Sequence, residues 1–579
     1  MTELNESFTI TGVDGSRKPF VTLGVLPLLV YLFFMLAAPL AILVVFSFWK
    51  ADFFSVTRTF TLENYSRLAT SPIFVSVLFK TLSSSLLASC IAVLIAYAMA
   101  YAIVFRLAVW GPRVLTLVMA SLLSSYVVRL YALTTILGTN GILNKALIAS
   151  GLVRAPLEFL LYGYPAIILT LIYVYLPIAI LPIFASLQGI DRRLLEASRD
   201  LGCGPWRTFL RITLPLSARG LRTAFAFCFI LAGSDYVAAR LVGGMNGQMI
   251  GSIIADQFGG ASNYPFGAAL SVVLVAGFAL VLSGCYIVER ATAWMATRSF
   301  WRAFAGLRLS LPDIPLTETI TFLGLVFLFA PLLTVMIFSF NNTPNPGIPF
   351  TGFTVHWYVD VVQDPGFHRA LGTSLTIAAI SVAGAMLLGL PAALALARRQ
   401  FVLGHFTMLA IFAPISVPGV VIGASLLATF ITLGVKLGVA TTAAAHVMLV
   451  IPFIIQVIRA RLEKIDPRVE EAARDLGSSP MRVLRTVTLP ILATAVLAAG
   501  ILAAAISLDE LLVTNFTIGT NATVPVWISS QMRIGLTPAL NAVAILMLVG
   551  SLGSIAIGAS ATRRNRSRRF AEEIGEIKA

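Results

Sequence analysis

The chain has 579 residues, of which 58% are hydrophobic and only 12% are charged, and its mean hydropathy is +0.91. A soluble domain carries about 25% charged residues, so this composition excludes both a soluble enzyme and a disordered chain. The net charge of +15 would suit a nucleic-acid partner, but the placement of the basic residues explains it better. We therefore expect most of the chain to lie in lipid, with no nucleic acid bound.

Twelve apolar stretches are long enough to cross a bilayer, which takes about 20 mostly apolar residues. In chain order they cover residues 21–48, 81–105, 114–137, 160–187, 223–242, 267–288, 320–340, 371–397, 406–431, 441–458, 491–516 and 540–559. The sequence therefore predicts an all-α membrane protein with about twelve transmembrane helices.

The basic residues gather in alternate loops. Most of the 41 Lys and Arg fall on one side of the membrane when these spans are threaded back and forth. By the positive-inside rule that side is the cytoplasm, and both termini lie there. Five arginines between residues 563 and 569 follow the last span, where they would anchor the tail to anionic headgroups of the bilayer.

Two loops on the basic side repeat each other. Residues 191–215 read DRRLLEASRDLGCGPWRTFLRITLP, and residues 466–490 read DPRVEEAARDLGSSPMRVLRTVTLP, 275 positions later without a gap. Each half holds six spans, an even number, so both halves enter the membrane from the same side and form a parallel repeat. We divide the chain into a first repeat (1–288), a cytoplasmic linker (289–316) and a second repeat (317–579).

Each repeated loop has the pattern of a helix, a turn and a second helix. Asp191 and Asp466 are suitable N-caps, and Gly202 and Gly477 tolerate the left-handed conformation at a helix end. Ser479 is a further cap candidate before Pro480. An amphipathic hairpin resting on lipid headgroups would also explain such a loop, but it would not require the same Glu, Asp, Gly and Pro in both copies. The duplication favours a pair of docking sites for a protein.

The loops also resemble a known family. The order Glu-Ala-Ala, three residues, Gly, nine residues, Ile or Val, one residue, Leu-Pro is similar to the cytoplasmic motif of permease subunits in type I ATP-binding cassette importers. Ser198 replaces an Ala, and Val487 an Ile. The resemblance implies that family's permease fold and two coupling loops that dock on a separate ATPase. The implied coupling residues are Glu196, Ala197, Asp200, Gly202, Glu471, Ala472, Asp475 and Gly477.

Two further stretches resemble spermidine and putrescine importers. Residues 125–151, with Arg129, Tyr131, Gly141, Leu143 and Asn144, look like their first permease, and residues 507–546 look like their second. This implies two permeases fused in one chain of the bacterial inner membrane. It also implies two copies of a cytoplasmic ATPase, a periplasmic solute-binding protein and a small cationic solute. Fused permeases also occur among ferric-iron importers, which keeps iron as an alternative solute.

The chain lacks its own energy source. No GxxxxGK[ST] loop for nucleotide phosphates is present, so ATP and magnesium are expected on the partner ATPase, with no cofactor on this chain and no catalysis by it. The four histidines are scattered and predict no metal site. An ion-coupled secondary transporter remains the rival class, because it too can be a parallel six-plus-six repeat, although it would leave the duplicated loops unexplained.

Ionisable residues within spans usually face a protein interior or a water-filled path. The candidates for a solute pathway are Asp235, Asp509, Glu510, Arg129, Tyr131, Tyr236 and Trp527. The three acids would favour a cation over an anion, and the aromatic rings could contact a protonated amine. Alternatively, the acids pair with Arg129 or cap helix ends. His446 is expected to serve in helix packing, and the prolines and glycines of 414–423 mark either a bend beside the pathway or close packing.

Overall fold

The structure is a computed structural model. It describes residues 18–51, 56–122, 124–139, 141–157, 160–244, 247–295, 316–343, 350–398, 404–535, 537–550 and 553. Most of the expected linker and the arginine cluster of the tail therefore lie outside the described residues.

The described part of the chain is almost entirely helical. The first repeat contains α1 (Lys18–Leu32), α2 (Ala38–Phe46), α3 (Glu63–Thr70), α4 (Pro72–Tyr101), α5 (Gly111–Leu122), α6 (Tyr126–Leu137), α7 (Ile142–Ala149), α8 (Tyr164–Gln188), α9 (Arg192–Asp200), α10 (Pro205–Thr208), α11 (Leu214–Ser234), α12 (Tyr236–Val242), α13 (Ile250–Phe258) and α14 (Tyr264–Met295). The second contains α16 (Leu316–Phe338), α17 (His356–Gln363), α18 (Pro365–Arg398), α19 (Gly404–Ser416), α20 (Gly419–Thr432), α21 (Val439–Leu462), α22 (Arg468–Asp475), α23 (Pro480–Val483), α24 (Leu489–Asp509), α25 (Thr514–Thr517) and α26 (Val524–Ile534). A small antiparallel pair, β1 (Lys50–Ala51) and β2 (Val56–Thr57), is the sheet of the described region.

The helices confirm a many-spanning membrane protein. Among the described residues, nine helices are long and apolar enough to cross a bilayer, and two further pairs, bent by 91° and 97°, bring the number to eleven. A shorter apolar helix, Pro538–Gly550, lies at the start of the expected twelfth span, and most of the rest of that expected span lies outside the described residues. The predicted third and ninth spans are thus bent pairs rather than straight helices.

Two predicted spans have the wrong boundaries. The fifth, expected at 223–242, runs instead over Pro205–Ser234, and the eleventh, expected at 491–516, runs over Pro480–Asp509. In both cases the sequence stays apolar past an acidic residue, which hides the break at Asp235 and Glu510. Hydropathy alone cannot place such a break, because the short helix beyond it is buried as well.

We call the two repeated loops, residues 191–215 and 466–490, the docking loops. A π-helical turn lies near the end of each, at the same position in both repeats. These turns are η5 (Phe209–Thr213) and η7 (Leu484–Thr488), and each lies just before a Leu-Pro pair. Pro215 and Pro490 have no N–H to donate, and their rings conflict with the carbonyl four residues earlier. The extra residue of the π-turn accommodates the ring, with the Leu214 and Leu489 N–H groups bonded to the carbonyls of Phe209 and Leu484. Similar turns, η2 (Phe33–Ala37) and η3 (Ala102–Arg106), interrupt two other spans.

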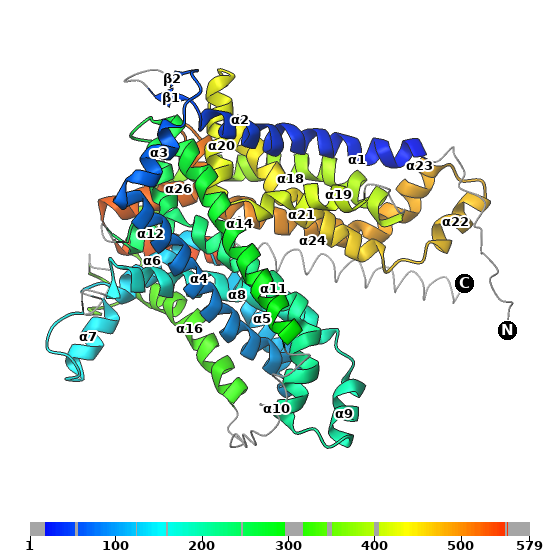
Figure 1. Ribbon diagram of the computed structural model, residues 1–579, viewed down its shortest axis with the longest axis horizontal. Coiled ribbons are helices and arrows are strands. Elements are labelled where there is room, and N and C mark those ends of the chain that lie inside the picture. Colours follow the sequence, from blue (N-terminus) through cyan, green and yellow to red (C-terminus); the bar gives the residue numbers. More distant parts are fainter. Residues whose placement is uncertain are drawn as a thin grey trace.

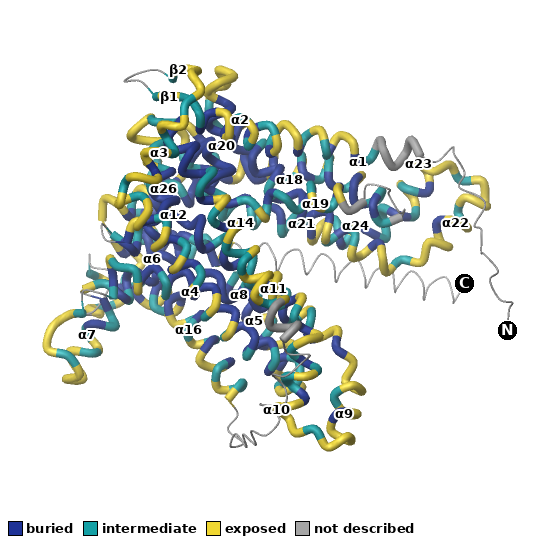
Figure 2. The backbone as a smooth tube through the Cα atoms, in the orientation of Figure 1, coloured by how far each residue is buried: buried dark blue, intermediate teal, exposed yellow. Residues whose placement is uncertain are grey.

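The molecule has the shape of a V (Figure 1). One arm carries α4, α5, α8, α11 and α16 and ends at α9 and α10, while the other carries α1, α18, α19, α21 and α24 and ends at α22 and α23. The arms meet at a common end that contains α3, α12, α20 and α26. Burial is heaviest where the arms join and lightest at the tips (Figure 2).

The first helix of each repeat packs on the other repeat. In α1, Leu28 and Leu32 are buried in the core of the second arm, and the hydroxyl of Tyr31 donates to the Ala444 carbonyl. In α16, Leu328 belongs to the core of the first arm, and its carbonyl accepts a hydrogen bond from Tyr173 at 3.3 Å. The sequence repeats are therefore interlocked in space.

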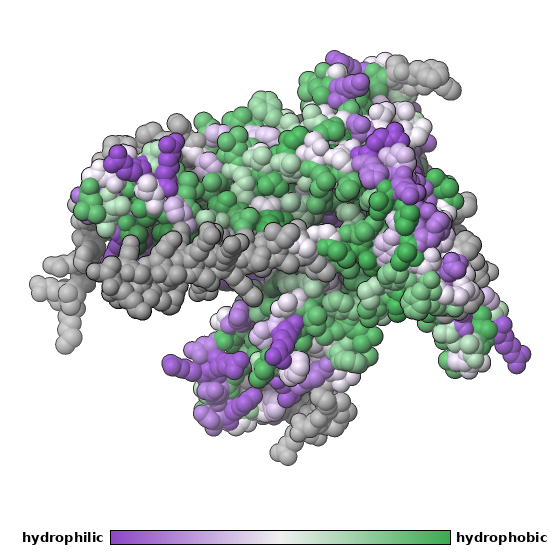
Figure 3. Space-filling view, turned by 180° about the vertical axis from the view of Figure 1, so that it is seen from behind, coloured by the Kyte–Doolittle hydropathy of each residue, from purple (hydrophilic) through white to green (hydrophobic). Residues whose placement is uncertain are grey.

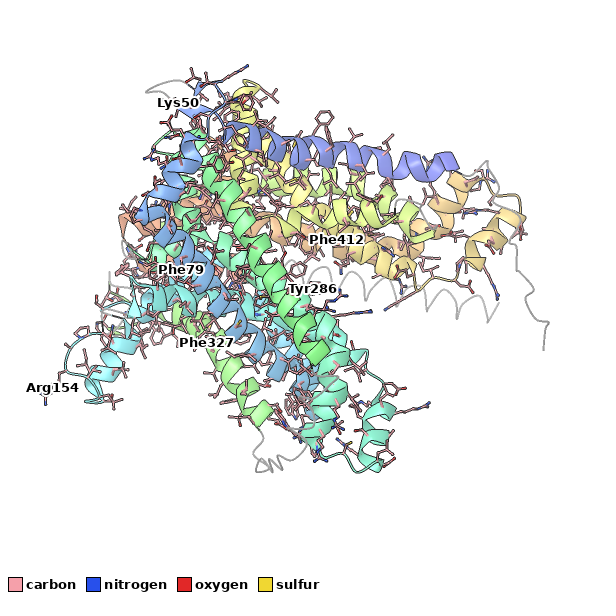
Figure 4. The ribbon with its side chains drawn as sticks, in the orientation of Figure 1. Lys50, Phe79, Arg154, Tyr286, Phe327 and Phe412 are labelled. Carbon is pink, nitrogen blue, oxygen red and sulfur yellow. The ribbon has the colours of Figure 1, made fainter. Side chains whose placement is uncertain are left out.

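The two repeats differ at the common end of the arms. From the start of α6 to α20 the offset between them is 293 residues, but from α8 to α21 it is 275, so the first repeat has 18 additional residues. These include α7, which projects from one edge of the common end (Figure 1). Lys50 and Arg154 lie at opposite edges of this end (Figure 4). The insertion is the main departure from the pseudo-symmetry of the fold.

Candidate functional site

The two docking loops fold alike from their first residue. The Asp191 carboxylate accepts a hydrogen bond from the Arg193 N–H at 2.9 Å, and Asp466 accepts one from Arg468 at 3.0 Å. Ser479 caps α23 by accepting from the Arg482 N–H at 3.4 Å, as its position before Pro480 predicts. The expected helix, turn and helix are confirmed in both loops.

Both loop helices end in the same glycine motif. Gly202 has φ +75° and Gly477 has φ +81°, in the left-handed region where glycine carries no steric penalty. The N–H of Gly202 bonds to the Arg199 carbonyl at 2.9 Å, and the next N–H, of Cys203, reaches Ser198 at 3.0 Å. The same two bonds form at Gly477 and Ser478. This is the Schellman arrangement, which satisfies the last carbonyls of the helix.

One face of each loop helix is tied to the following helix, and the other is free. Ser198 is buried and lies 2.9 Å from the Thr208 hydroxyl, and buried Glu470 accepts from the Thr488 hydroxyl at 3.0 Å. The eight predicted coupling residues are all exposed: Glu196, Ala197, Asp200, Gly202, Glu471, Ala472, Asp475 and Gly477. The free face is therefore the one that carries the predicted coupling residues.

Each loop also carries an exposed leucine that the sequence pattern had not singled out. Leu201 and Leu476 occupy equivalent positions before the glycines and are 84% and 87% exposed. The recurrence of a leucine at the same position of both loops was the available signal in the sequence. Figure 3 shows hydrophilic residues around the arm tips and a largely apolar surface along the arms, so each leucine is an apolar side chain within a charged surface.

Asp235 lies at the break between α11 and α12, where the arms join. Its side chain is fully buried and accepts hydrogen bonds from the Tyr126 hydroxyl, from the Tyr175 hydroxyl at 2.9 Å and from the Ala238 N–H at 2.9 Å. The last bond caps α12. The alternative that this acid caps a helix is thus what the geometry shows.

Glu510 occupies the equivalent break between α24 and α25. Its carboxylate accepts from the Val513 and Thr514 N–H groups at 2.8 Å and lies 3.5 Å from His446 Nε2. His446 is buried and also contacts the hydroxyls of Ser507 and Thr514 at 2.8 Å. The histidine therefore joins α21 to α24 and α25, as expected for a packing residue.

Asp509 joins the two repeats. Its carboxylate accepts a hydrogen bond at 2.8 Å from the N–H of Tyr126, the first residue of α6. Arg129 lies one turn further along α6. Arg129 is buried and donates to the Val174 carbonyl at 3.1 Å. Tyr126, which the sequence analysis did not select, thus connects Asp235 of the first repeat with Asp509 of the second.

The three predicted aromatic residues have separate contacts in the structure. Tyr131 donates to the Thr537 carbonyl at 2.9 Å, and Tyr236 accepts from Asn515 at 2.8 Å. Arg240 already lies over the Tyr236 ring, 5.4 Å from its centroid. Trp527 packs against Phe367 with 5.7 Å between ring centroids. The first two rings fasten the repeats together, and the third lies against the start of α18.

The proline and glycine segment of the second repeat both bends and packs. α19 and α20 meet at a bend of 97° beside Pro418. A β-carbon at Gly423 would lie 2.4 Å from the Phe516 ring, so the glycine permits close approach of α20 to α25. The segment therefore shows both a bend and close packing.

The fold and these sites define a class of protein: a polytopic membrane permease built from two interlocked repeats, each with a docking loop. Among the described residues, no group of three His, Cys, Asp or Glu could hold a metal ion. The profile of the family "Binding-protein-dependent transport system inner membrane component" matches residues 114–299 and 385–567. The chain belongs to this family and carries its domain twice. It is therefore a multi-pass inner-membrane transport subunit that works with a solute-binding protein and an ATPase.

Curated relatives cover one repeat at a time. The chain is 36% identical over 252 residues to the putrescine transport system permease protein PotI of Escherichia coli, which is 42% of this chain and 89% of the relative. It is 32% identical over 222 residues to the spermidine/putrescine permease protein PotB of Haemophilus influenzae, or 38% of this chain and 77% of the relative. A chain of a bacterial ABC transporter involved in import of the acidic polysaccharide alginate gives a TM-score of 0.40 at 19% identity, covering 48% of this chain and 96% of that one.

Proposed function

We propose that the chain is the complete permease of an importer for a small polyamine-type cation such as putrescine or spermidine. The observation that carries this proposal is the pair of docking loops, each closed by the same glycine motif, at the free tips of the two arms. One chain then takes the place of two separate permeases. The names of the relatives, together with the acids where the arms join, support the choice of solute.

In this proposal two copies of an ATPase bind ATP and magnesium, and each copy grips one loop around Glu196–Gly202 or Glu471–Gly477. The loops and both termini lie in the cytoplasm, so the V opens inward and its common end faces the periplasm. A binding protein delivers solute to that end. This chain binds no cofactor and catalyses no covalent step. ATP binding moves the arms because the ATPase contacts differ between the two states.

The acids supply the electrostatic preference in this proposal. Asp235, Asp509 and Glu510 lie where the arms meet, and negative charge in a low-dielectric passage favours a cation. Tyr236 contributes less than the sequence analysis expects, because its ring already faces Arg240. The acids also cap helices in this conformation, so the two roles alternate with the state of the arms.

The test begins with affinity purification of the tagged chain from its own membrane, followed by mass spectrometry. Recovery of an ATPase in about twofold excess supports the docking assignment, and the copurified binding protein is then assayed with putrescine, spermidine and ferric iron. Glu196→Lys should abolish ATP-driven uptake while the chain still inserts into the membrane. Absence of any ATPase, with uptake still active, would instead favour an ion-coupled transporter.

A further inference from the structure

Buried polar side chains at the start of α6 lack hydrogen-bond partners. In the described part of the structure, the hydroxyl of Ser124 and the Nε of Arg129 are buried without a hydrogen-bond partner. A buried donor without a partner is costly, and such groups in a native structure require an explanation. A second set of partners in another conformation of this segment would explain both.

The same helix start is held by a contact between the repeats. The N–H of Tyr126 donates to Asp509 at 2.8 Å, and the Tyr126 hydroxyl donates to Asp235. Tyr126 and Asp235 belong to the first repeat and Asp509 to the second. Breaking the N–H to Asp509 bond is therefore a step in any separation of the repeats at this end.

We infer that Tyr126 is the latch of the external gate, and that a protonated amine of the solute competes with its N–H for Asp509. In the closed gate the carboxylate is held by the helix start. When the repeats part, the carboxylate is released and can accept an ammonium group. Solute binding thus favours the open gate, and reclosing of α6 on Asp509 displaces the solute toward the inside. This inference rests on the proposed function for the outward orientation of the common end and for the identity of the solute, whereas the contact between Tyr126 and Asp509 does not depend on it.

A matched pair of substitutions isolates the latch. Tyr126 is the first residue of α6, a position at which proline fits a helix because its N–H is not needed there. The preceding Ser125 has φ −53° and ψ 137°, which suits a residue before proline. Tyr126→Pro therefore removes ring, hydroxyl and N–H, whereas Tyr126→Ala removes only the ring and hydroxyl. Tyr175→Phe serves as control, because Tyr175 also donates to Asp235 but stays within one repeat.

The exposed loop tips provide the readout. Nitroxide labels on Trp206→Cys and Met481→Cys, which are exposed, equivalent in the two loops and outside the predicted coupling residues, report the distance between the arms in a chain whose four native cysteines are replaced by alanine. The measurement uses the chain with its ATPase in lipid nanodiscs, without binding protein. A hydrogen bond to a charged group corresponds to about a tenfold shift in an equilibrium or more. We expect Tyr126→Pro to increase the short-distance population about tenfold over Tyr126→Ala, and Tyr175→Phe to leave it unchanged.

The competition is tested with putrescine as the probe. Putrescine should increase the short-distance population of the wild-type chain, and Asp509→Asn, which keeps an acceptor but loses the charge, should abolish that response. Equal populations for the proline and alanine variants would overturn the latch. If the Asp509→Asn variant responded to putrescine as strongly as the wild-type chain does, the proposed competition would be overturned. Failure of the wild-type complex to import putrescine, with the proline and alanine variants still different, would instead refute the proposed solute and leave the latch standing.

Discussion

The left-handed glycine of each docking loop offers a sharp test of coupling. Gly202 has φ +75°, and a β-carbon added there would meet nothing within 4 Å. Gly202→Ala therefore introduces no clash, and its cost is the conformational penalty of about 1–2 kcal/mol for a residue with a β-carbon in this region. Because the loop ends in exposed residues, that penalty should displace the turn rather than unfold the chain. We expect a loss of about fivefold to thirtyfold in the population of the docking-competent loop.

Gly204 is the matched control. A β-carbon there also meets nothing within 4 Å, but Gly204 has φ −64°, and the second loop carries Ser479 at the equivalent position with φ −63°. Gly204→Ala should therefore be close to neutral. The assay measures affinity of the ATPase for the permease in nanodiscs and solute uptake in proteoliposomes. If Gly202→Ala and Gly204→Ala behave alike, the left-handed turn does not position the docking surface and the reasoning is wrong.

Three other predictions follow from the packing and the acids. Gly423→Ala should lower the thermal midpoint in detergent, because overpacking against Phe516 costs about 1–3 kcal/mol, whereas Gly372→Ala, which faces open space, should not. Asp235→Asn and Glu510→Gln keep an acceptor for the helix caps but lose the charge, so uptake should fall at normal membrane abundance; unchanged uptake would leave both acids only a capping role. Tyr31→Phe and Tyr173→Phe each remove one hydrogen bond between the first helix of a repeat and the other repeat, so each should lower the free energy of unfolding by about 1 kcal/mol. If denaturant titrations show no loss for either variant, these interlocking contacts do not stabilise the fold.

The docking loops were predictable because their determinants are local. Asp191, Gly202 and Ser479 each act through a backbone group within a few residues, and sequence spacing specifies such contacts. The two buried ties, Ser198 to Thr208 and Glu470 to Thr488, also stay within one loop. The recurrence of Leu201 as Leu476 could have been noticed from the same repeat.

The acids Asp235, Asp509 and Glu510 could be selected from the sequence, but not all of their hydrogen-bond partners could, because some of these partners are distant in sequence. Asp235 and Asp509 stood out as charges in apolar segments, but the residue that joins them, Tyr126, looks like any interfacial tyrosine. Its bond to Asp509 links positions 383 residues apart, and no local pattern encodes such a contact. The surroundings of Tyr131, Tyr236 and Trp527 were not predictable for the same reason, since aromatic type does not indicate which neighbour already covers the ring.

The first helix of each repeat packs on the other repeat, and this restricts how the arms can move. Leu28 and Leu32 of α1 pack in the core of the second arm, while Leu43 and Phe46 of α2 pack in the core that fills the common end. The π-turn η2 lies between these two groups, within a single span. A rigid span would have to break one set of contacts when the arms close, whereas a π-turn can change its winding locally. We therefore expect the bends needed for transport to fall at η2 and at the turns η5 and η7 of the docking loops, because bending there would let ATPase motion reach the arms while both cores stay packed.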